Sequence, residues 1–447
     1  MTESLVTTHP PETGSPRPDT ARTPGISAPV LEFLRERRPE TPCLVIDLDV
    51  VAQRFHQVRA ALPWAEVYYA VKANPAREVV RLLAELGANF DVASPAEIDL
   101  CLAQGARPEC VSYSNPIKKL SHIEYAYRRG VRLFAFDSEQ DLEHIAAAAP
   151  GSSVFCRILV ASPTTEGGAR TPFGTKFGCA PEMAVDLLHR AARLGLDACG
   201  ASFHVGSQQL DPTAWDAGIA TVARVAEELD QRSVPLRVLN LGGGFPATYL
   251  ETPPPLAGYG AAIEESVRRH FGDRPLRLLV EPGRAIVADA GVIRSEVVLV
   301  ARKSADDERR WVYLDIGRYG GLAETENEAI AYRLVTSRDS GPTGPVVIAG
   351  PTCDGDDVLY QRRVYRLPLD LRAGDHVDLL GAGAYTASYA SVAFNGFAPL
   401  TTYCVPADAL SPTEAASGTA DAHGNGVGDK ERRRCTTDVI SKTVVGQ

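Results

Sequence analysis

Short apolar segments alternate with amphipathic segments along the first two thirds of the chain. The apolar segments are bounded by turn-forming residues, which predicts strands at 43–48, 67–73, 89–94, 110–115, 133–138, 153–160, 199–206, 237–244 and 276–283. Between them apolar residues recur at helical spacing, which predicts helices over 76–86, 95–105, 138–149 and 213–229. Repeated strand–helix units with apolar strands favour a parallel sheet covered by helices.

The number of these units favours a (β/α)8 barrel, in which active residues lie at the C-terminal ends of the strands. After about residue 285 the pattern changes to strands joined by turns, which predicts a separate, mostly antiparallel β domain. We expect an α/β protein with a barrel over 28–285, whose first residues could join the β domain, and a β-rich domain over 286–404. The segments 1–27 and 405–447 are poor in apolar residues and predict disordered tails.

Composition narrows the class of protein further. The 447 residues carry a net charge of -10, which argues against a nucleic acid or an anionic membrane as partner. The chain has no run of about eighteen apolar residues and no secretory signal at its N-terminus. Its 9 cysteines are scattered without a Cys-x-x-Cys motif, so neither a disulfide framework nor a metal site is expected. These features predict a reduced, cytoplasmic protein.

Lys72 stands where an apolar strand meets a turn. Tyr, Val and Ala precede it, and Asn74 and Pro75 follow it. We expect burial at the end of the strand to disfavour the ammonium form, so that the pKa falls and the amine becomes a nucleophile suited to a Schiff base. From this motif alone, Lys72 could instead be a surface lysine whose side chain extends to solvent.

Three further motifs follow predicted strands. The run Gly242–Gly244 lets backbone N–H groups converge on an anion, although a structural turn is the alternative. In the segment EPGR, Glu281 could face a heteroaromatic nitrogen and Arg284 a phosphate, or the two could pair with each other. His204 is either a satisfied core histidine or a flat ring that stacks on a planar cofactor, with Ser207 donating to its phosphate.

The β-rich domain carries the remaining candidates. Cys353 lies between turn residues in GPTCDGDD and is expected to be exposed, and the carboxylates after it would attract a cationic substrate. A metal loop is disfavoured, because the acidic spacing does not fit an EF-hand and no histidine lies nearby. Tyr385 and Phe394 suggest a tyrosine hydroxyl and an aromatic wall near the same cleft.

Together these motifs resemble one family. The segments AVKAN, FDVAS, HVGSQ, GGGFP, EPGR, GPTCDG, GAYT and FNGF occur in the order seen in the fold-type III pyridoxal-phosphate basic amino acid decarboxylases, the ornithine decarboxylase group, over roughly residues 30–402. The resemblance implies an alanine-racemase-like barrel, pyridoxal 5'-phosphate as cofactor, and a role in polyamine biosynthesis. The expected reaction converts L-ornithine and/or L-lysine to putrescine and/or cadaverine plus CO2, through an external aldimine and a quinonoid.

The resemblance also implies a role for each matching residue. Lys72 is expected to form the internal aldimine, Glu281 to protonate the pyridine nitrogen, and His204 to stack on the ring. Cys353 is expected to supply an acid from a neighbouring subunit, which makes the protein a homodimer with shared active sites. The remaining cofactor-binding residues are expected to be Asp91, Arg157, Ser207, Gly242, Gly243, Gly244, Arg284 and Tyr385. The substrate is expected to contact Asp354, Glu324 and Phe394.

The chain departs from the family pattern at one place. The Tyr-Asp pair that grips the distal amine in eukaryotic-type enzymes is missing from 317–330, where Glu324 or Glu326 could replace it. This stretch is more similar to the bacterial lysine/ornithine subgroup. Ornithine and lysine differ by one methylene, worth about 1–3 kcal/mol of discrimination, so both could react. The alternatives are a decarboxylase of diaminopimelate or another basic amino acid, a racemase using Tyr385 as base, and a catalytically dead regulatory homologue.

Overall fold

The computed structural model describes residues 25–160, 175–338 and 340–406. Most of both predicted tails lies outside these ranges, over 1–24 and 407–447. Ile26 falls within the predicted N-terminal tail, yet it is buried against Val30 and Phe33 of helix α1 (Ala28–Arg37). No helix in the described ranges is long and apolar enough to cross a membrane.

Eight parallel strands form the closed barrel that the repeated strand–helix pattern predicts. The strands are β2 (Ala65–Ala70), β3 (Asn89–Val92), β4 (Val111–Tyr113), β5 (Leu133–Phe136), β6 (Ser153–Arg157), β7 (Asp197–Ser202), β8 (Val238–Asn240) and β9 (Arg277–Val280). Side chains from six of these strands, including Tyr68, Phe155 and Leu279, form a buried cluster of their own. The fold class is confirmed.

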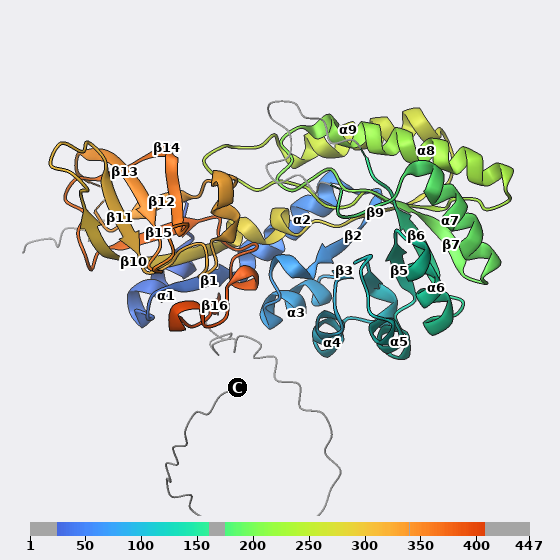
Figure 1. Ribbon diagram of the computed structural model, residues 1–447, viewed down its shortest axis with the longest axis horizontal. Helices are drawn as coiled ribbons and strands as arrows, with labels where there is room; N and C mark the ends of the chain where they lie inside the picture. Colours follow the sequence, from blue (N-terminus) through green and yellow to red (C-terminus); the bar gives the residue numbers. More distant parts are fainter. Residues whose placement is uncertain (1–24, 161–174, 339, 407–447) are drawn as a thin grey trace, which may run out of the picture. The chain divides into compact units, whose positions relative to one another are not determined.

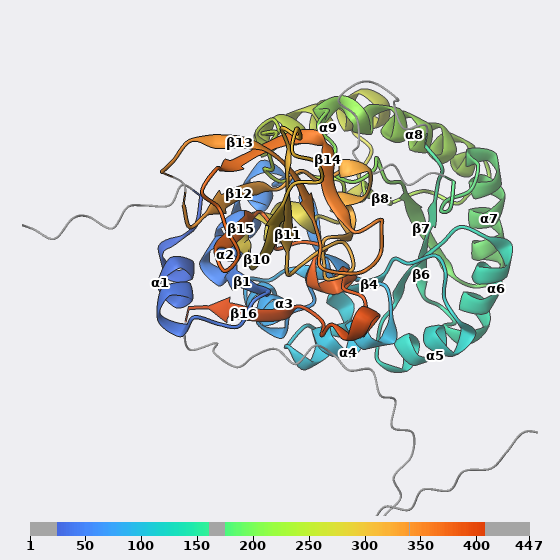
Figure 2. The ribbon, with the colours of Figure 1, turned by 60° about the vertical axis from the view of Figure 1, so that its left-hand side comes forward.

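Helices surround the barrel strands as an outer ring (Figure 2). They are α2 (Leu48–Ala61), α3 (Arg77–Glu85), α4 (Pro95–Ala103), α5 (Leu120–Arg128), α6 (Glu139–Ala148), α7 (Pro181–Arg193), α8 (Asp216–Gln231) and α9 (Leu256–Phe271). Local sequence sets several of their starts. Ser94 caps α4 and Ser138 caps α6, each accepting a hydrogen bond from a backbone N–H three residues on.

A second sheet is built mostly from the chain after the barrel (Figure 1). Its strands are β10 (Gly291–Ala301), β11 (Arg310–Leu314), β12 (Arg333–Thr336), β13 (Thr343–Ala349), β14 (Val358–Pro368), β15 (His376–Leu380) and β16 (Thr401–Val405), joined by β1 (Cys43–Asp47). Most pairs are antiparallel, whereas β11–β13 and β1–β16 are parallel. The domain limits at 28, 285 and 404 stay a prediction.

Strand β1 shows where the hydrophobic pattern is ambiguous. Every residue of β1 is buried, so it reads like a barrel strand. In the structure it pairs with β10 and β16 instead, and the barrel begins with β2. The N-terminal segment therefore joins the β sheet before the chain enters the barrel.

The turn after β15 lies against the turn that carries Lys72. The backbone N–H of Tyr385 donates to the carbonyl of Ala73 at 2.8 Å, and the Asn74 amide donates to the carbonyl of Gly383 at 2.8 Å. A Cβ on Gly383 would lie 1.9 Å from the carbonyl oxygen of Val287, so only glycine allows this close approach. These contacts place a tyrosine of the β sheet beside the barrel lysine.

Candidate active site

A cleft at the C-terminal ends of four barrel strands brings most of the predicted cofactor residues together. It is lined by Ala70, Lys72, His204, Ser207, Gln208, Gly243, Gly244, Phe245, Glu281, Gly283, Arg284 and Tyr385. All but Tyr385 end β2, β7, β8 or β9 or lie in the segments that follow these strands. This is the end of the barrel where the residues of a (β/α)8 active site lie.

Lys72 lies in the short 3-10 turn that follows β2. Its Nζ donates to Oδ2 of Asp91 at 2.9 Å; Asp91 is buried, whereas the lysine side chain is 46% exposed to the cleft. The expectation that burial lowers the pKa of Lys72 is wrong. Burial does lower it, but the charges of Asp91, Tyr385 and Glu281 outweigh that effect and raise the pKa above its ordinary value. These charges therefore favour the ammonium form of Lys72.

Glu281 follows β9 directly and is held by an amide. The Asn240 side chain donates to Oε1 of Glu281 at 2.6 Å and accepts from the N–H of Gly242 at 2.9 Å. Burial, together with the nearby charge of Asp91, raises the pKa of Glu281 to about 7. A cationic ring nitrogen placed beside this carboxyl group would favour its ionised form, and the resulting carboxylate would hold the proton on that nitrogen.

His204 follows β7 and presents a neutral ring. Its Nδ1 accepts a hydrogen bond from the N–H of Gly206 at 2.9 Å, which fixes the tautomer with the proton on Nε2. Burial and the nearby positive charges of Arg157 and Lys72 hold its pKa well below the ordinary value. A flat, uncharged ring beside the glycine loop fits stacking on a planar cofactor.

The glycine loop after β8 leaves room for an anion. A Cβ on Gly243 would lie 2.7 Å from the carbonyl oxygen of Glu281 and 3.2 Å from Nε2 of His204. Gly244 has φ +101° and no space for a side chain beside the carbonyl of Gly206. Within the described ranges, neither N–H donates a hydrogen bond. Two unused donors at a cradle that a Cβ would fill suit a phosphate group.

Arg157 and Glu97 adjoin this cleft without lining it. Arg157 ends β6, and its guanidinium lies 4.9 Å from the centre of the Phe177 ring. Burial lowers the pKa of Arg157, whereas the charges of Glu281 and Asp91 oppose that shift. Burial also raises the pKa of Glu97 to about 7, against a hydrogen bond of 2.6 Å from the N–H of Ala93. The residues around Lys72 are thus electrostatically coupled.

Arg284 is engaged in an ion pair that the sequence does not predict. Its Nη1 and Nη2 donate to the two carboxylate oxygens of Glu324 at 2.8 and 2.5 Å, and Nη1 also donates to the Tyr249 hydroxyl at 2.8 Å. The side chains of Arg284 and Glu324 are both buried. Glu324 therefore contacts the arginine predicted for the phosphate, and its predicted contact with the substrate amine remains untested.

The predicted acid and substrate residues of the β sheet lie outside the Lys72 cleft. Cys353 is exposed, and its Sγ accepts from the Asn395 amide at 3.4 Å. Its neighbour Asp354 accepts from the N–H of Asp356 at 2.8 Å. The rings of Tyr319 and Phe394 lie 4.6 Å apart. Within one chain, the predicted site is therefore divided into two groups of residues.

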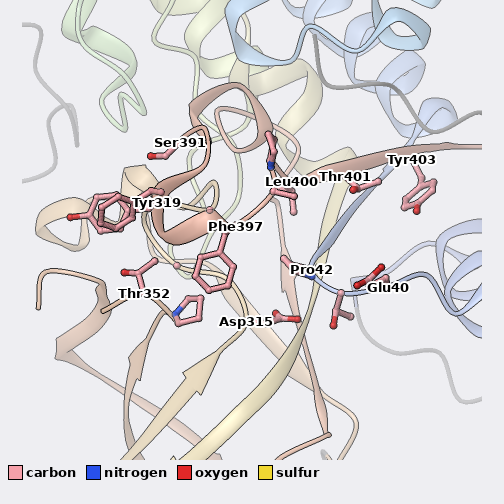
Figure 3. Close-up of a pocket in the computed structure, with 17 residues that line it drawn as sticks. Glu40, Pro42, Asp315, Tyr319, Thr352, Ser391, Phe397, Leu400, Thr401 and Tyr403 are labelled. Carbon is pink, nitrogen blue, oxygen red and sulfur yellow. The ribbon is translucent and has the colours of Figure 1, made fainter. Parts of the chain in front are cut away.

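A cavity of about 300 Å³ lies beside the second group. Figure 3 shows Tyr319, Thr352 and Phe397 at this cavity, with Asp315 and Glu40 farther along it. Phe394 also lines it, so this ring lies with the Tyr319 group rather than in the Lys72 cleft of the same chain. Among the described residues, no group of three or more His, Cys, Asp or Glu side chains could hold a metal ion.

Sequence reasoning missed two residues that shape the cleft. Asn240 precedes the glycine run and orients Glu281, and its position directly before LGGG is a signal that could have found it. Tyr249 holds Arg284 through its hydroxyl but lies in a segment without a recognisable motif. Long-range contacts of this kind do not follow from local pattern.

Comparison with known proteins identifies the family. Residues 48–288 match the family model of the pyridoxal-dependent decarboxylase, pyridoxal binding domain. The chain belongs to this family, and the resemblance inferred from its motifs is confirmed. It is accordingly an enzyme of the pyridoxal-phosphate-dependent decarboxylase class, and its cleft offers the amine, carboxyl group, flat ring and anion cradle that this cofactor requires.

Individual relatives are similar over most of their length. The lysine/ornithine decarboxylase of Selenomonas ruminantium is 35% identical over 373 residues, which cover 83% of this chain and 91% of the relative. The crystal structure of the Vibrio vulnificus lysine/ornithine decarboxylase with cadaverine is 31% identical, with a TM-score of 0.75, and covers 85% of this chain and 99% of its own. Antizyme inhibitor 2 of Xenopus laevis is 33% identical over 366 residues, covering 79% of this chain and 78% of its own.

Proposed function

We propose that this protein decarboxylates L-ornithine and L-lysine to putrescine and cadaverine, releasing CO2. The observation that carries this proposal is the cleft in which Lys72, paired with Asp91 at 2.9 Å, lies with Glu281, His204 and the glycine loop. Relatives that bear the name lysine/ornithine decarboxylase support the two substrates. When bound, pyridoxal phosphate supplies an aldehyde for an amine and a conjugated ring that accepts the electron pair left on the substrate Cα when CO2 departs.

Each residue of the cleft has a separate task in this proposal. Lys72 must lose a proton before its amine can attack, and Oδ2 of Asp91, at 2.9 Å, is placed to accept that proton. Glu281 holds the proton on the ring nitrogen, which favours electron withdrawal from the substrate. The neutral His204 ring would stack on the cofactor ring and exclude water from that side of the cleft. The N–H groups of Gly243 and Gly244, with Ser207, bind the phosphate.

We propose that the exposed Cys353 group completes the cleft of a second copy of the chain. Cys353 would donate a proton from Sγ to the substrate Cα after CO2 has left, and Asp354 would bind the distal ammonium. Two facts support a shared site: neither residue lines the Lys72 cleft of its own chain, and Thr352, directly before Cys353, lines a cavity with aromatic walls. We also infer that the protein acts in the cytoplasm, in keeping with its scattered cysteines.

The test is release of CO2 by the purified full chain with added pyridoxal phosphate. L-ornithine, L-lysine, L-arginine and meso-diaminopimelate are supplied separately, and the amine product is identified. We expect release from ornithine and lysine, with the ratio of kcat/KM values defining the preference. Release from diaminopimelate alone would contradict the proposal. Bound cofactor without release from any substrate would favour the racemase or the catalytically dead homologue.

A further inference from the structure

Glu324 holds the arginine that the proposed function assigns to the cofactor phosphate. Its carboxylate meets Arg284 through two parallel hydrogen bonds of 2.8 and 2.5 Å, and both side chains are at least nine-tenths buried. A phosphate binds a guanidinium with the same two-pronged geometry. The carboxylate therefore occupies positions on Arg284 that a phosphate could use.

The guanidinium of Arg284 has one N–H donor, at Nε, for which the described ranges provide no hydrogen bond. Nη1 donates to Glu324 and Tyr249, and Nη2 donates to Glu324, whereas Nε makes no hydrogen bond within the described ranges. A phosphate could reach the Nε edge, or it could displace Glu324 from the Nη edge. In either case a dianion would lie close to the charge of Glu324 in a water-poor site, where repulsion between like charges is strong.

We propose that Glu324 competes with the cofactor phosphate for Arg284, and so lowers the affinity of the enzyme for pyridoxal phosphate. This inference rests on the proposed function, because it takes Arg284 to be a phosphate ligand. When no phosphate is bound, the carboxylate neutralises a buried cation. Binding of the phosphate then gives up part of that stabilisation, which makes the cofactor easier to release.

The chain contains a matched arrangement far from the cleft. Arg277, at the start of β9, donates to both carboxylate oxygens of Glu66 at 2.7 Å and to the Tyr68 hydroxyl at 2.8 Å. Both charged side chains are more than 40% exposed. Glu66→Gln therefore makes the same chemical change in the same kind of Arg–Glu–Tyr group, but away from the cofactor.

The test compares Glu324→Gln with Glu66→Gln in the full chain after removal of the cofactor. Each protein is titrated with pyridoxal phosphate and with pyridoxal, which lacks the phosphate, and the Kd is read from absorbance. We expect Glu324→Gln to bind pyridoxal phosphate about tenfold more tightly or better, within the range typical of coupled sites. Pyridoxal should bind both variants as it binds the wild type, and Glu66→Gln should leave both Kd values unchanged.

Each other outcome contradicts the proposal in a distinct way. Weaker binding of pyridoxal phosphate to Glu324→Gln would show that Glu324 positions Arg284 for the phosphate rather than competing with it. Unchanged cofactor binding with an altered kcat/KM ratio for lysine and ornithine would make Glu324 a substrate ligand. If wild-type protein binds no pyridoxal phosphate, the proposed function itself fails, which the titration shows before any variant is compared.

A buried, unpaired guanidinium could prevent the empty variant from folding. The rate of cofactor release from holoenzyme purified with its cofactor then replaces the titration. Slower release from Glu324→Gln than from wild type supports competition, and equal or faster release contradicts it. Glu324→Asp serves as a second variant, because it keeps the charge; we expect its release rate to lie closer to that of the wild type.

Discussion

The two groups of predicted site residues are held in opposite ways. In the barrel group, Lys72, His204 and Glu281 follow strands of a closed sheet, and each makes a defined hydrogen bond at 2.6–2.9 Å. In the β-sheet group, Cys353 is exposed, and its Sγ has only a long contact with the Asn395 amide at 3.4 Å. One group is therefore gathered in a cleft of a single chain, whereas the other is exposed on its surface.

This difference separates two kinds of task. Holding a planar cofactor requires groups fixed in advance, which the strand ends of a barrel provide. Delivering a proton to a substrate requires a group that can reach it, and an exposed thiol on a turn meets that need only if another surface covers it. The difference therefore predicts that loss of a barrel residue destroys cofactor chemistry, whereas loss of a β-sheet residue spares cofactor binding.

The largest effect is expected from Lys72→Ala. Without the amine that forms the covalent link, the protein should lose the visible absorbance of the bound cofactor and about a thousandfold or more of its decarboxylation rate. Absorbance spectra and CO2 release measure the two effects. Lys303→Ala, which removes a lysine that lies over the Trp311 ring on the second sheet, is the matched control and should change neither. Full activity in Lys72→Ala would overturn the proposed mechanism.

Cys353→Ala is expected to separate the two groups. The cofactor spectrum should match that of the wild type, because the thiol lies outside the Lys72 cleft. Formation of amine should fall by about 10²–10⁴-fold, the usual contribution of a general acid. Product analysis of the full chain provides the measurement, with the half-buried Cys110→Ala as control. A spectrum lost together with activity would place Cys353 in the cofactor site instead.

Mixing the two inactive variants tests whether the groups belong to different chains. If Lys72→Ala and Cys353→Ala subunits exchange at random, half of the dimers are mixed and each contains one intact site, so activity should recover to about one quarter of the wild type. The mixture is assayed for CO2 release after subunit exchange, against each variant alone. No recovery despite proven exchange would show that each site uses residues of one chain.

The barrel group could be predicted from sequence because its chemistry follows from local position. Lys72, His204, Gly243 and Glu281 each lie one to three residues after the end of a barrel strand, and a parallel barrel brings such ends together. Only the sign of the Lys72 pKa shift was wrong, because desolvation is a local effect, whereas the opposing charge of Asp91 comes from the neighbouring strand.

The pairing of β1 and the partner of Arg284 could not be predicted, because both depend on contacts between distant segments. Strand β1 is buried along its whole length, as a barrel strand would be, so hydrophobicity left open whether it joins the barrel or the β domain, and in the structure it pairs with β10. The pair formed by Arg284 and Glu324 joins the barrel to the second sheet across 40 residues. The motif EPGR suggested a local partner for the arginine, and the fold provided a remote one instead.

The smallest predicted effect concerns Glu281 and the pH dependence of stability. Burial and the charge of Asp91 raise the pKa of Glu281 to about 7, so between about pH 4.5 and 7 the folded state binds more protons than the unfolded state. Stability contributed by this group is therefore lost as the pH rises through that range. Glu281→Gln removes this titration. The free energy of unfolding of the variant minus that of the wild type should therefore be larger at pH 8 than at pH 5, by on the order of 2 kcal/mol. Urea unfolding of both cofactor-free proteins at the two pH values measures this difference, and equal values would show that the buried carboxyl group titrates as it does in water.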